Sequence, residues 1–216
     1  PRLRSLNLSR NEIDSLPNWI EQLNHLEVLL LSDNLIRELP AELTRLNNLR
    51  KIDLSKNRIQ KLPVTMGKLK QLRQLILKDN LLRRLPKSIT TCEQLDQLDL
   101  SGNQLARLPE QIGMLGQLSQ LNLARNRLKT LPTSLGNCSY LRQLSLNNNR
   151  LESLPENIGQ IGWLAKLNCS KNKLRALPGS LGECRQLQEV DFSQNRVEAL
   201  PSTFSALHRL YKLQLN

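Results

Sequence analysis

The stretch that decides the fold is LRKIDLSKNRIQKLPVTMGKLKQ, residues 49 to 71. Its spacing of leucines, one asparagine and one proline recurs every 23 residues along the 216-residue chain, without a slip in register. Nine full copies of LxxLxLxxNxLxxLPxxIxxLxx begin at Leu3, and a tenth begins at Leu210. Repeat position 1 is the first leucine of each copy. A fixed period of this length is typical of a solenoid, in which each repeat forms one coil stacked on its neighbours.

The start of each copy predicts a short strand. Ile52 and Leu54 alternate with the polar Lys51 and Asp53, and alternation at period two indicates a half-buried strand. We therefore expect positions 4 and 6 to face the core and positions 3 and 5 to face solvent. Stacked coils would place parallel strands about 4.8 Å apart on one face.

Asparagine follows at position 9 in every full copy, where the chain turns off the strand. The turn leaves backbone N–H and C=O groups without partners. A side-chain amide both donates and accepts, so one asparagine can satisfy its own turn and the next. The sequence thus predicts a buried ladder of hydrogen bonds formed by Asn11, Asn34, Asn57, Asn80, Asn103, Asn126, Asn149, Asn172 and Asn195.

Proline at position 15 of every full copy suits the first residue of a helical turn, because its φ is fixed. Apolar residues then recur at spacings of three, as at Met66, Leu69 and Leu72, which fits a 3-10 segment better than a long α-helix. Glycines after position 18, such as Gly67, further discourage a long helix. We expect slim helical segments opposite the sheet, a leucine core between them, and a shallow curve with the sheet inside.

The unbroken repeat predicts one domain over residues 1–216. No run of about 18 apolar residues is present that could span a membrane, and no signal peptide is visible. The chain begins at Pro1 in mid-repeat, and Leu3 and Leu215 lie within predicted strands, where a terminal cap would be needed for solubility. We therefore expect an uncapped fragment of a longer protein.

The four cysteines, Cys92, Cys138, Cys169 and Cys184, all replace core leucines. Those at position 21 are two repeats apart, roughly 10 Å at the usual strand spacing, which exceeds the roughly 7 Å limit for a disulfide. We expect reduced, buried thiols rather than disulfides or a metal site. Free core thiols favour a reducing compartment, and we expect a cytoplasmic protein.

No catalytic constellation is evident in the sequence. Asp53 and Asp99 would lie two strands apart on an open sheet, without the burial or close neighbours that general acid–base catalysis needs. His25 and His208 are eight repeats apart, and no cysteine is placed with a histidine. No glycine-rich phosphate loop or metal-ligand spacing appears. We expect no enzymatic activity, no catalytic residue, no cofactor and no metal.

Positive charge is concentrated in two repeats. The net charge is +12, yet residues 49 to 91 hold twelve Lys or Arg against Asp53 and Asp79 alone. Coils stack closer than the Debye length of about 8 Å at physiological salt, so these charges would act together on an acidic protein partner. A solvated face that aids solubility is the alternative interpretation. Nucleic acid is disfavoured, because aromatic side chains or a groove-shaped element are missing.

Apolar residues interrupt the polar column at position 5 in the same region. Leu30 and Ile76 stand where other copies carry mainly Asp or Asn, and contiguous exposed apolar residues mark interaction sites. Local packing, or coverage by a missing N-terminal cap, is the alternative. The predicted partner-binding residues are Val28, Leu30, Lys51, Asp53, Lys56, Arg58, Ile76 and Lys78.

The motif LxxLxLxxNxLxxLPxxIxxLxx resembles the leucine-rich repeat in its 23-residue LPxxIxxL class, over essentially the whole chain. Similar repeats occur in Scribble-type scaffolds, plant intracellular Ras-group proteins, Roco GTPase-kinases and bacterial repeat proteins. The resemblance implies a right-handed α/β solenoid, a horseshoe with a parallel β-sheet on its concave face and short 3-10 or helical segments on its convex face.

The resemblance also implies a function. In this family the concave sheet usually binds another protein, and catalysis, where present, belongs to a separate domain. We expect a protein–protein interaction module or signalling scaffold that binds a partner protein on its concave face. The alternative is a substrate-recognition or regulatory arm of a multidomain enzyme, such as a kinase, GTPase or bacterial effector, whose catalytic domain is outside this chain. No oligomeric state is predicted.

Overall fold

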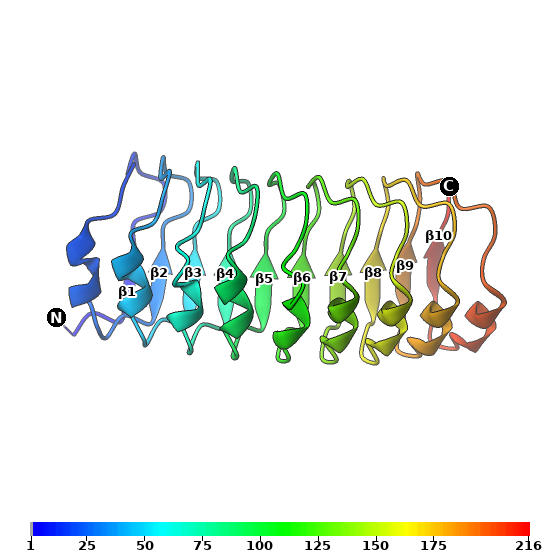
Figure 1. Ribbon diagram of the computed structural model, residues 1–216. Coiled ribbons are helices and arrows are strands. Elements are labelled where there is room, and N and C mark those ends of the chain that lie inside the picture. The colour runs from blue at the N-terminus through cyan, green and yellow to red at the C-terminus, as the bar shows by residue number, and fades with distance from the viewer. Residues whose placement is uncertain (1) are drawn as a thin grey trace.

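A computed structural model describes residues 2–216, and Pro1 lies outside the described residues. The described chain forms one ten-stranded parallel sheet whose strands follow each other in chain order. 3-10 helices lie opposite the sheet, and the two ends of the chain lie at opposite ends of an elongated stack (Figure 1). This is the predicted solenoid.

The strands are β1 (Ser5–Asn7), β2 (Val28–Leu30), β3 (Lys51–Asp53), β4 (Gln74–Ile76), β5 (Gln97–Asp99), β6 (Gln120–Asn122), β7 (Gln143–Ser145), β8 (Lys166–Asn168), β9 (Glu189–Asp191) and β10 (Lys212–Gln214). The 3-10 helices are η1 (Asn18–Gln22), η2 (Ala41–Arg45), η3 (Met66–Lys68), η4 (Lys87–Thr91), η5 (Ile112–Met114), η6 (Thr133–Asn137), η7 (Glu156–Gln160), η8 (Gly179–Glu183) and η9 (Ser202–Ala206).

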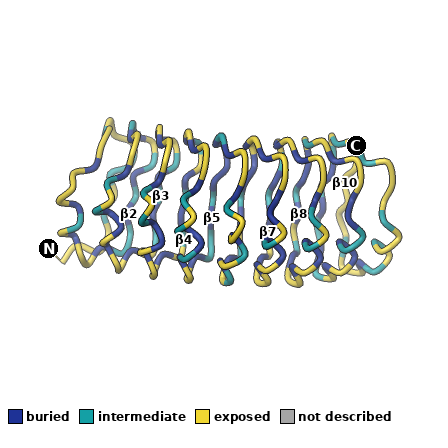
Figure 2. The backbone as a smooth tube through the Cα atoms, in the orientation of Figure 1, coloured by how far each residue is buried: buried dark blue, intermediate teal, exposed yellow. Residues whose placement is uncertain are grey.

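Neighbouring strands pair with an offset of one repeat. In β3 and β4, Lys51 lies opposite Gln74 and Asp53 opposite Ile76. Ile52 between them is fully buried, while Lys51 and Asp53 are half-buried. The same alternation recurs in β2 to β9, whereas β1 has a half-buried centre and β10 is exposed throughout. Figure 2 shows the buried residues that recur from coil to coil along the stack. The predicted assignment of positions 3, 4 and 5 is confirmed.

The core is one continuous cluster of leucine and isoleucine that runs from Leu16 to Leu207. Phe192 is its largest fully buried side chain. Full burial of each such side chain contributes about 1.5–3 kcal/mol relative to exposure. Because a single coil exposes its apolar side chains on both flanks, the coils must stack to gain that stabilisation.

In the interior of the stack the asparagine ladder forms as predicted, except that each asparagine bonds to the preceding coil and not to the following one. Asn57 Nδ2 donates to the carbonyl of Leu54 in its own coil at 3.1 Å and to that of Leu31 in the preceding coil at 2.9 Å. Its Oδ1 accepts from the Ile36 N–H at 3.0 Å. Each amide therefore joins its own turn to the turn of the preceding coil. We had predicted a link to the turn of the following coil.

The ends of the ladder differ from the prediction. Asn11 is exposed and bonds only within its own turn, to the carbonyls of Leu8 and Ser9. No coil precedes it among the described residues, so its Oδ1 has no neighbouring turn to serve. Asn172 and Asn195 keep the interior pattern but are only half-buried.

Position 8, just before the ladder asparagine, adopts a left-handed backbone. Among the described residues, eight side-chain-bearing residues at this position have φ between 53° and 61°, and Gly102 has φ 68°. This conformation costs roughly 1–2 kcal/mol for a residue with a Cβ. In this tight turn the backbone N–H of Lys56 donates to the Lys78 carbonyl of the following coil, with 2.8 Å between nitrogen and oxygen. The sequence analysis did not foresee this turn.

The proline lies one residue earlier than predicted before seven of the nine 3-10 helices described, and three residues earlier before η3 and η5. Pro40 has φ −66° and ψ 146°, so it precedes η2 as an extended N-cap instead of starting the helix. Its carbonyl accepts the first helical hydrogen bond from the Leu43 N–H at 3.2 Å. The helices themselves are short 3-10 segments, as predicted from the spacing of three.

The glycines after position 18 have a packing role that the sequence analysis missed. A Cβ added to Gly136 would lie 2.2 Å from the carbonyl oxygen of Asn157 in the next coil. Gly67 and Gly182 show the same conflict, at 2.3 and 2.4 Å from such a carbonyl. Glycine therefore allows adjacent helical faces to approach closely, which matters more than its low helix propensity.

All four cysteines are buried and free, as predicted. The Cys92 and Cys184 thiols donate to the carbonyls of Met66 and Ile158 in the preceding coil, at 3.4 and 3.3 Å. Burial raises the pKa of Cys92 and Cys138 to about 11 and that of Cys184 to about 12. These thiols stay protonated and are poor nucleophiles at neutral pH.

Candidate partner-binding face

The solvent-facing side of the sheet carries two rows of side chains, from positions 3 and 5 of each strand. In-register pairing places each row straight across the stack, so Leu30, Asp53 and Ile76 are adjacent on β2, β3 and β4. Leu30 and Ile76 are two strands apart, roughly 10 Å. A ligand on this face would therefore meet side chains from several repeats at once.

The structure brings five of the eight predicted partner-binding residues together on three strands. Val28 pairs with Lys51 in the position 3 row, and Leu30, Asp53 and Ile76 form the position 5 row. All five are half-buried, so they present part of each side chain to solvent.

The other three predicted residues lie beyond the strand ends. Lys56 and Lys78 are exposed and stacked in adjacent coils through the backbone hydrogen bond between them. Arg58 is exposed on the loop that follows the buried Asn57 and leaves the sheet. These cations border the apolar group along one edge.

Asp53 also has a structural role. Its Oδ1 accepts from the Ser55 N–H at 2.9 Å and from the Ser55 hydroxyl at 2.7 Å. Asp99 and Asp191 make the same turn with Ser101 and Ser193. The signal was present in the sequence as Asp or Asn followed two residues later by Ser. Leu30 and Ile76 lack this motif, which leaves their position for an apolar side chain.

A row of glutamines was missed by the sequence analysis. Gln74, Gln97, Gln120 and Gln143 occupy position 3 on β4 to β7 and line a hollow of about 190 Å³ together with Ile76. Gln74 Nε2 donates to Gln97 Oε1 at 2.7 Å. Each amide can donate and accept, so the hollow offers both kinds of polar contact beside the apolar residues Ile76, Leu98 and Leu121. Four successive glutamines at one position were the available signal.

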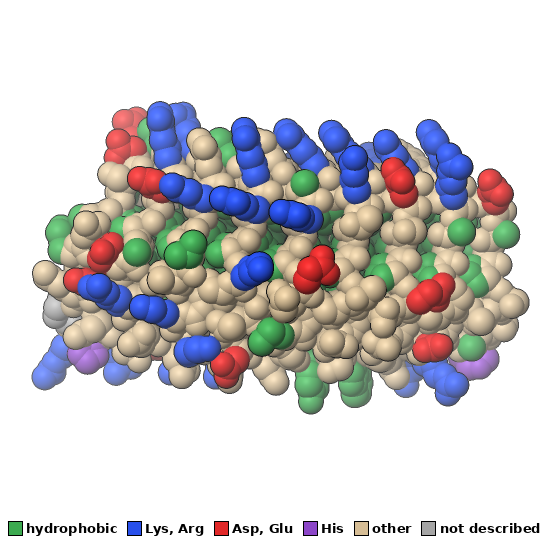
Figure 3. All heavy atoms as spheres, viewed as in Figure 1, with side chains coloured by type: hydrophobic (Ala, Val, Ile, Leu, Met, Phe, Trp, Pro, Cys, Tyr) green, Lys and Arg blue, Asp and Glu red, His purple; other side chains and the backbone are tan. Residues whose placement is uncertain are grey.

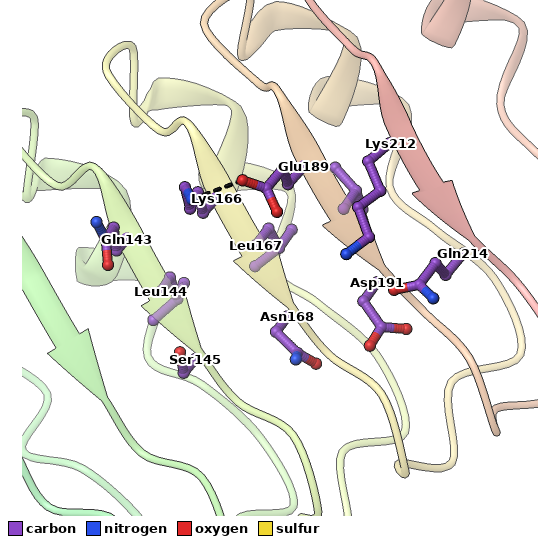
Figure 4. A pocket seen from close by; sticks show the side chains of 11 residues that line it. Gln143, Leu144, Ser145, Lys166, Leu167, Asn168, Glu189, Asp191, Lys212 and Gln214 are labelled. Atoms are coloured by element: carbon purple, nitrogen blue, oxygen red, sulfur yellow. Dashed lines mark ion pairs between the residues drawn. The ribbon is translucent and has the colours of Figure 1, made fainter.

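A second hollow of about 200 Å³ lies on the same face over β7 to β10 (Figure 4). Lys166 and Glu189 form an ion pair across adjacent strands, and the Tyr211 hydroxyl donates to Glu189 at 3.0 Å. The hydrogen bond between Lys166 and Glu189 lowers the pKa of Glu189 and raises the pKa of Lys166. This end of the face is polar and internally paired, unlike the region around Leu30 and Ile76.

The basic cluster is more neutralised than the sequence count indicates. Glu27 and Glu38 from the preceding repeat pair with Arg50 and Lys61 at 3.5 and 3.8 Å, and Glu93, at the end of the second basic repeat, pairs with Lys70 at 2.9 Å. Stacking thus adds partners that lie outside residues 49 to 91.

Groups suited to metal or acid–base chemistry are not assembled anywhere in residues 2–216. No cluster of three or more His, Cys, Asp or Glu in that range could hold a metal ion. The helices described are too short and polar for any of them to cross a bilayer.

Two leucine-rich repeat family profiles match the sequence, one over residues 47–105 and one over residues 2–23, 117–138 and 140–161. Together they span more than half of the chain. The chain is a leucine-rich repeat protein. Proteins with this fold are commonly protein-binding modules.

Solved structures place this leucine-rich repeat protein among similar solenoids. A leucine-rich repeat protein of Leptospira interrogans is 34% identical with a TM-score of 0.95, and the match covers 99% of this chain and 54% of that one. PEPR1, solved with AtPEP1, is 30% identical with a TM-score of 0.81, over 98% of this chain and 34% of that one.

The leucine-rich repeat ectodomain of GASSHO1/SCHENGEN3 from Arabidopsis thaliana, in complex with Casparian strip integrity factor 2, is 26% identical. Its TM-score is 0.69, and the match covers 99% of this chain and 35% of that one. This leucine-rich repeat protein therefore spans about half of the Leptospira protein and about a third of the plant receptors. A search of curated protein sequences found no match.

Proposed function

We propose that this leucine-rich repeat protein is a non-enzymatic binding module that docks a protein partner on its concave face, through its N-terminal half. The observation that carries the proposal is the apolar row interrupted by Asp53: Leu30 and Ile76 lie on the sheet where most other coils carry polar side chains. Ile76 also borders the glutamine-lined hollow. Apolar anchors with a polar rim are the usual anatomy of a protein interface.

The structural neighbours support a protein or peptide ligand. PEPR1 was solved with AtPEP1, and RGFR1, 26% identical to this chain, is a peptide hormone receptor solved with RGF2. Lys51, Lys56 and Lys78 border the apolar residues, which favours a partner with an acidic surface. Rim charges of this kind mainly speed association, so we expect binding to slow as salt concentration rises.

Affinity capture from the native host with the full-length protein tests this function. The test variant combines Leu30→Ala and Ile76→Ala with Lys51→Glu and Arg58→Glu. All four side chains are at least partly exposed, so the fold should survive, and we expect the partner to be lost.

The matched control places similar changes at the same repeat positions of later coils. Gln214→Ala, Lys212→Glu and Arg127→Glu occupy the positions that correspond to Ile76, Lys51 and Arg58. Capture should persist in this control. Unchanged partners in the first variant, or equal loss in both, would show that the proposed region is not the binding site.

We also propose that the protein works in the cytoplasm, as a signalling scaffold. Four free core thiols accord with a reducing compartment. Fractionation of host cells with an antibody to the protein tests this location, and recovery from the medium or cell envelope would exclude it. A regulatory arm of a multidomain enzyme would use the same surface, and the complete gene sequence distinguishes it from a scaffold.

A further inference from the structure

A larger hollow lies away from the sheet, on the loops that lead into η3, η4 and η5. Its volume is about 630 Å³, against about 190 and 200 Å³ for the two hollows on the concave face. Repeat positions 13 to 16 of three successive coils form its lining. We call it the Val64 hollow and use Lys61, Val64, Arg84, Lys87, Arg107 and Glu110 to define it.

The charge of the Val64 hollow is strongly positive. Four cations line it against the single carboxylate of Glu110. Lys61 meets Glu38 only at 3.8 Å, with both side chains more than 70% exposed, so this pair is weak. Arg84, Lys87 and Arg107 have no ion-pair partner within residues 2–216. Figure 3 shows Lys and Arg side chains gathered over the N-terminal half of this side of the molecule.

An apolar side chain stands among these cations. Val64 is 80% exposed, which is the largest exposure of any large hydrophobic residue described between residues 2 and 216. It holds position 16, where the next coil has Lys87 and the following one Glu110. An exposed aliphatic group within a hollow ringed by guanidinium and ammonium groups is suited to a ligand that is both anionic and apolar.

We propose that the Val64 hollow docks an acidic segment of a partner protein that carries an apolar side chain between its carboxylates. The apolar side chain packs on Val64, and the carboxylates face Arg84, Arg107 and Lys61. Arginine suits this task because its planar guanidinium binds a carboxylate through two parallel hydrogen bonds. A nucleic acid fits less well, because no aromatic side chain lines the hollow for base stacking.

The hollow and the concave face use different repeat positions, 13 to 16 against 3 and 5. A partner segment here would leave the sheet free, so the inference does not depend on the function proposed above. The two sites would let one chain hold two partners, or two parts of one partner.

Fluorescence anisotropy with labelled peptides tests the inference on the full chain. The probe is the peptide DEEDLEDEE, and its companion has glycine in place of the leucine. We expect the leucine peptide to bind about threefold to tenfold more tightly, because it buries apolar surface on Val64. Arg84→Glu with Arg107→Glu should weaken it about tenfold or more, and Val64→Asp should remove the preference for leucine.

The control Arg150→Glu with Lys173→Glu makes the same change in net charge at exposed residues outside the hollow, and it should keep its affinity. Ile76→Asp should also keep it, which separates this test from that of the concave face. Equal weakening in the control would mean that net charge alone binds the peptide and would overturn the inference. Tighter binding of oligothymidine than of the peptide, lost in the Arg84/Arg107 variant, would overturn it in favour of nucleic acid.

Discussion

At the scale of single residues, the ladder asparagines join adjacent coils through buried hydrogen bonds. Asn103 is 7% exposed, and its Nδ2 donates to the carbonyls of Leu77 and Leu100 at 2.9 and 3.0 Å, while its Oδ1 accepts from the Leu82 N–H at 2.9 Å. Each buried group left without a partner costs about 1–3 kcal/mol. We expect Asn103→Ala to lower the free energy of unfolding by about 3 kcal/mol in urea titration.

Asn11→Ala provides the matched comparison for that prediction. Asn11 is exposed and serves only its own turn, so water can replace its hydrogen bonds. Its loss should cost about 1 kcal/mol or less. If both substitutions destabilised the protein equally, the interior hydrogen bonds between coils would not have the weight assigned to them.

The buried thiols predict a pH dependence that is also a property of single residues. Burial raises the pKa of Cys92 and Cys138 to about 11 and that of Cys184 to about 12, against about 8.5 in an unfolded chain. The folded state therefore holds these protons more tightly. Their contribution to stability is complete below about pH 8.5 and is lost as pH rises toward 11.

Urea titrations at about pH 7.5 and 10.5, on either side of the unfolded-state thiol pKa, check this prediction. The comparison variant changes Cys92, Cys138 and Cys184 to leucine, the residue that most copies carry at position 21. Tyrosines and lysines titrate in both proteins, so the difference between the two isolates the thiols. We expect a smaller alkaline loss in the leucine variant, and an identical loss would rule out the thiol contribution.

At the scale of elements, the glycines control how closely one helical face packs on the next. A Cβ at Gly136 would lie 2.2 Å from Asn157 O, whereas a Cβ at Gly116 would meet nothing within 4 Å. Gly136→Ala should therefore force η6 and η7 apart and cost about 1–3 kcal/mol. Gly116→Ala should be neutral or stabilise by up to about 1 kcal/mol. Thermal unfolding of the two variants checks the contrast, and a similar midpoint would contradict the packing role.

The same elements show what could be predicted from the sequence. Alternation at Lys51, Ile52 and Asp53 predicts the strand, because the same repeat position faces the core in successive coils and therefore carries an apolar residue in each. The left-handed turn at position 8 could not be predicted, because Arg, Asp, Lys, Asn and Gln all occupy it and only the backbone pairing with the next coil selects that φ. The role of Gly136 was missed for a similar reason, since the clash lies in a different repeat.

The candidate site was predictable only in part. Leu30 and Ile76 stand out because they break a polar column, and register then places them beside Asp53. The Val64 hollow was not predicted, because the cations and the valine that distinguish it come from positions 13 and 16, which vary from coil to coil. Ion pairs such as Lys61 with Glu38 were missed because they join different repeats. Contacts set by stacking, rather than by local pattern, account for these omissions.

At the scale of the whole molecule, coils pack on their immediate neighbours, and the Arg125–Asp79 ion pair reaches across one intervening coil, so stability should fall toward the ends. Position 4 gives a matched pair: Leu121 on β6 is 1% exposed and Leu213 on β10 is 37% exposed. Leu121→Ala removes core packing on both sides and should cost about 2–5 kcal/mol. Leu213→Ala should cost about 1 kcal/mol or less, because water already reaches that side chain.

Native-state hydrogen exchange tests the same gradient without substitution. The amides of β10 lie at the end of the described stack, so local opening exposes them without disturbing the central coils. Those of β6 are enclosed by coils on both sides and require a much larger opening. We therefore expect faster exchange in β10 than in β6. Equal protection across all ten strands would mean that the solenoid unfolds only as a single unit, and the nearest-neighbour account of its stability would be wrong.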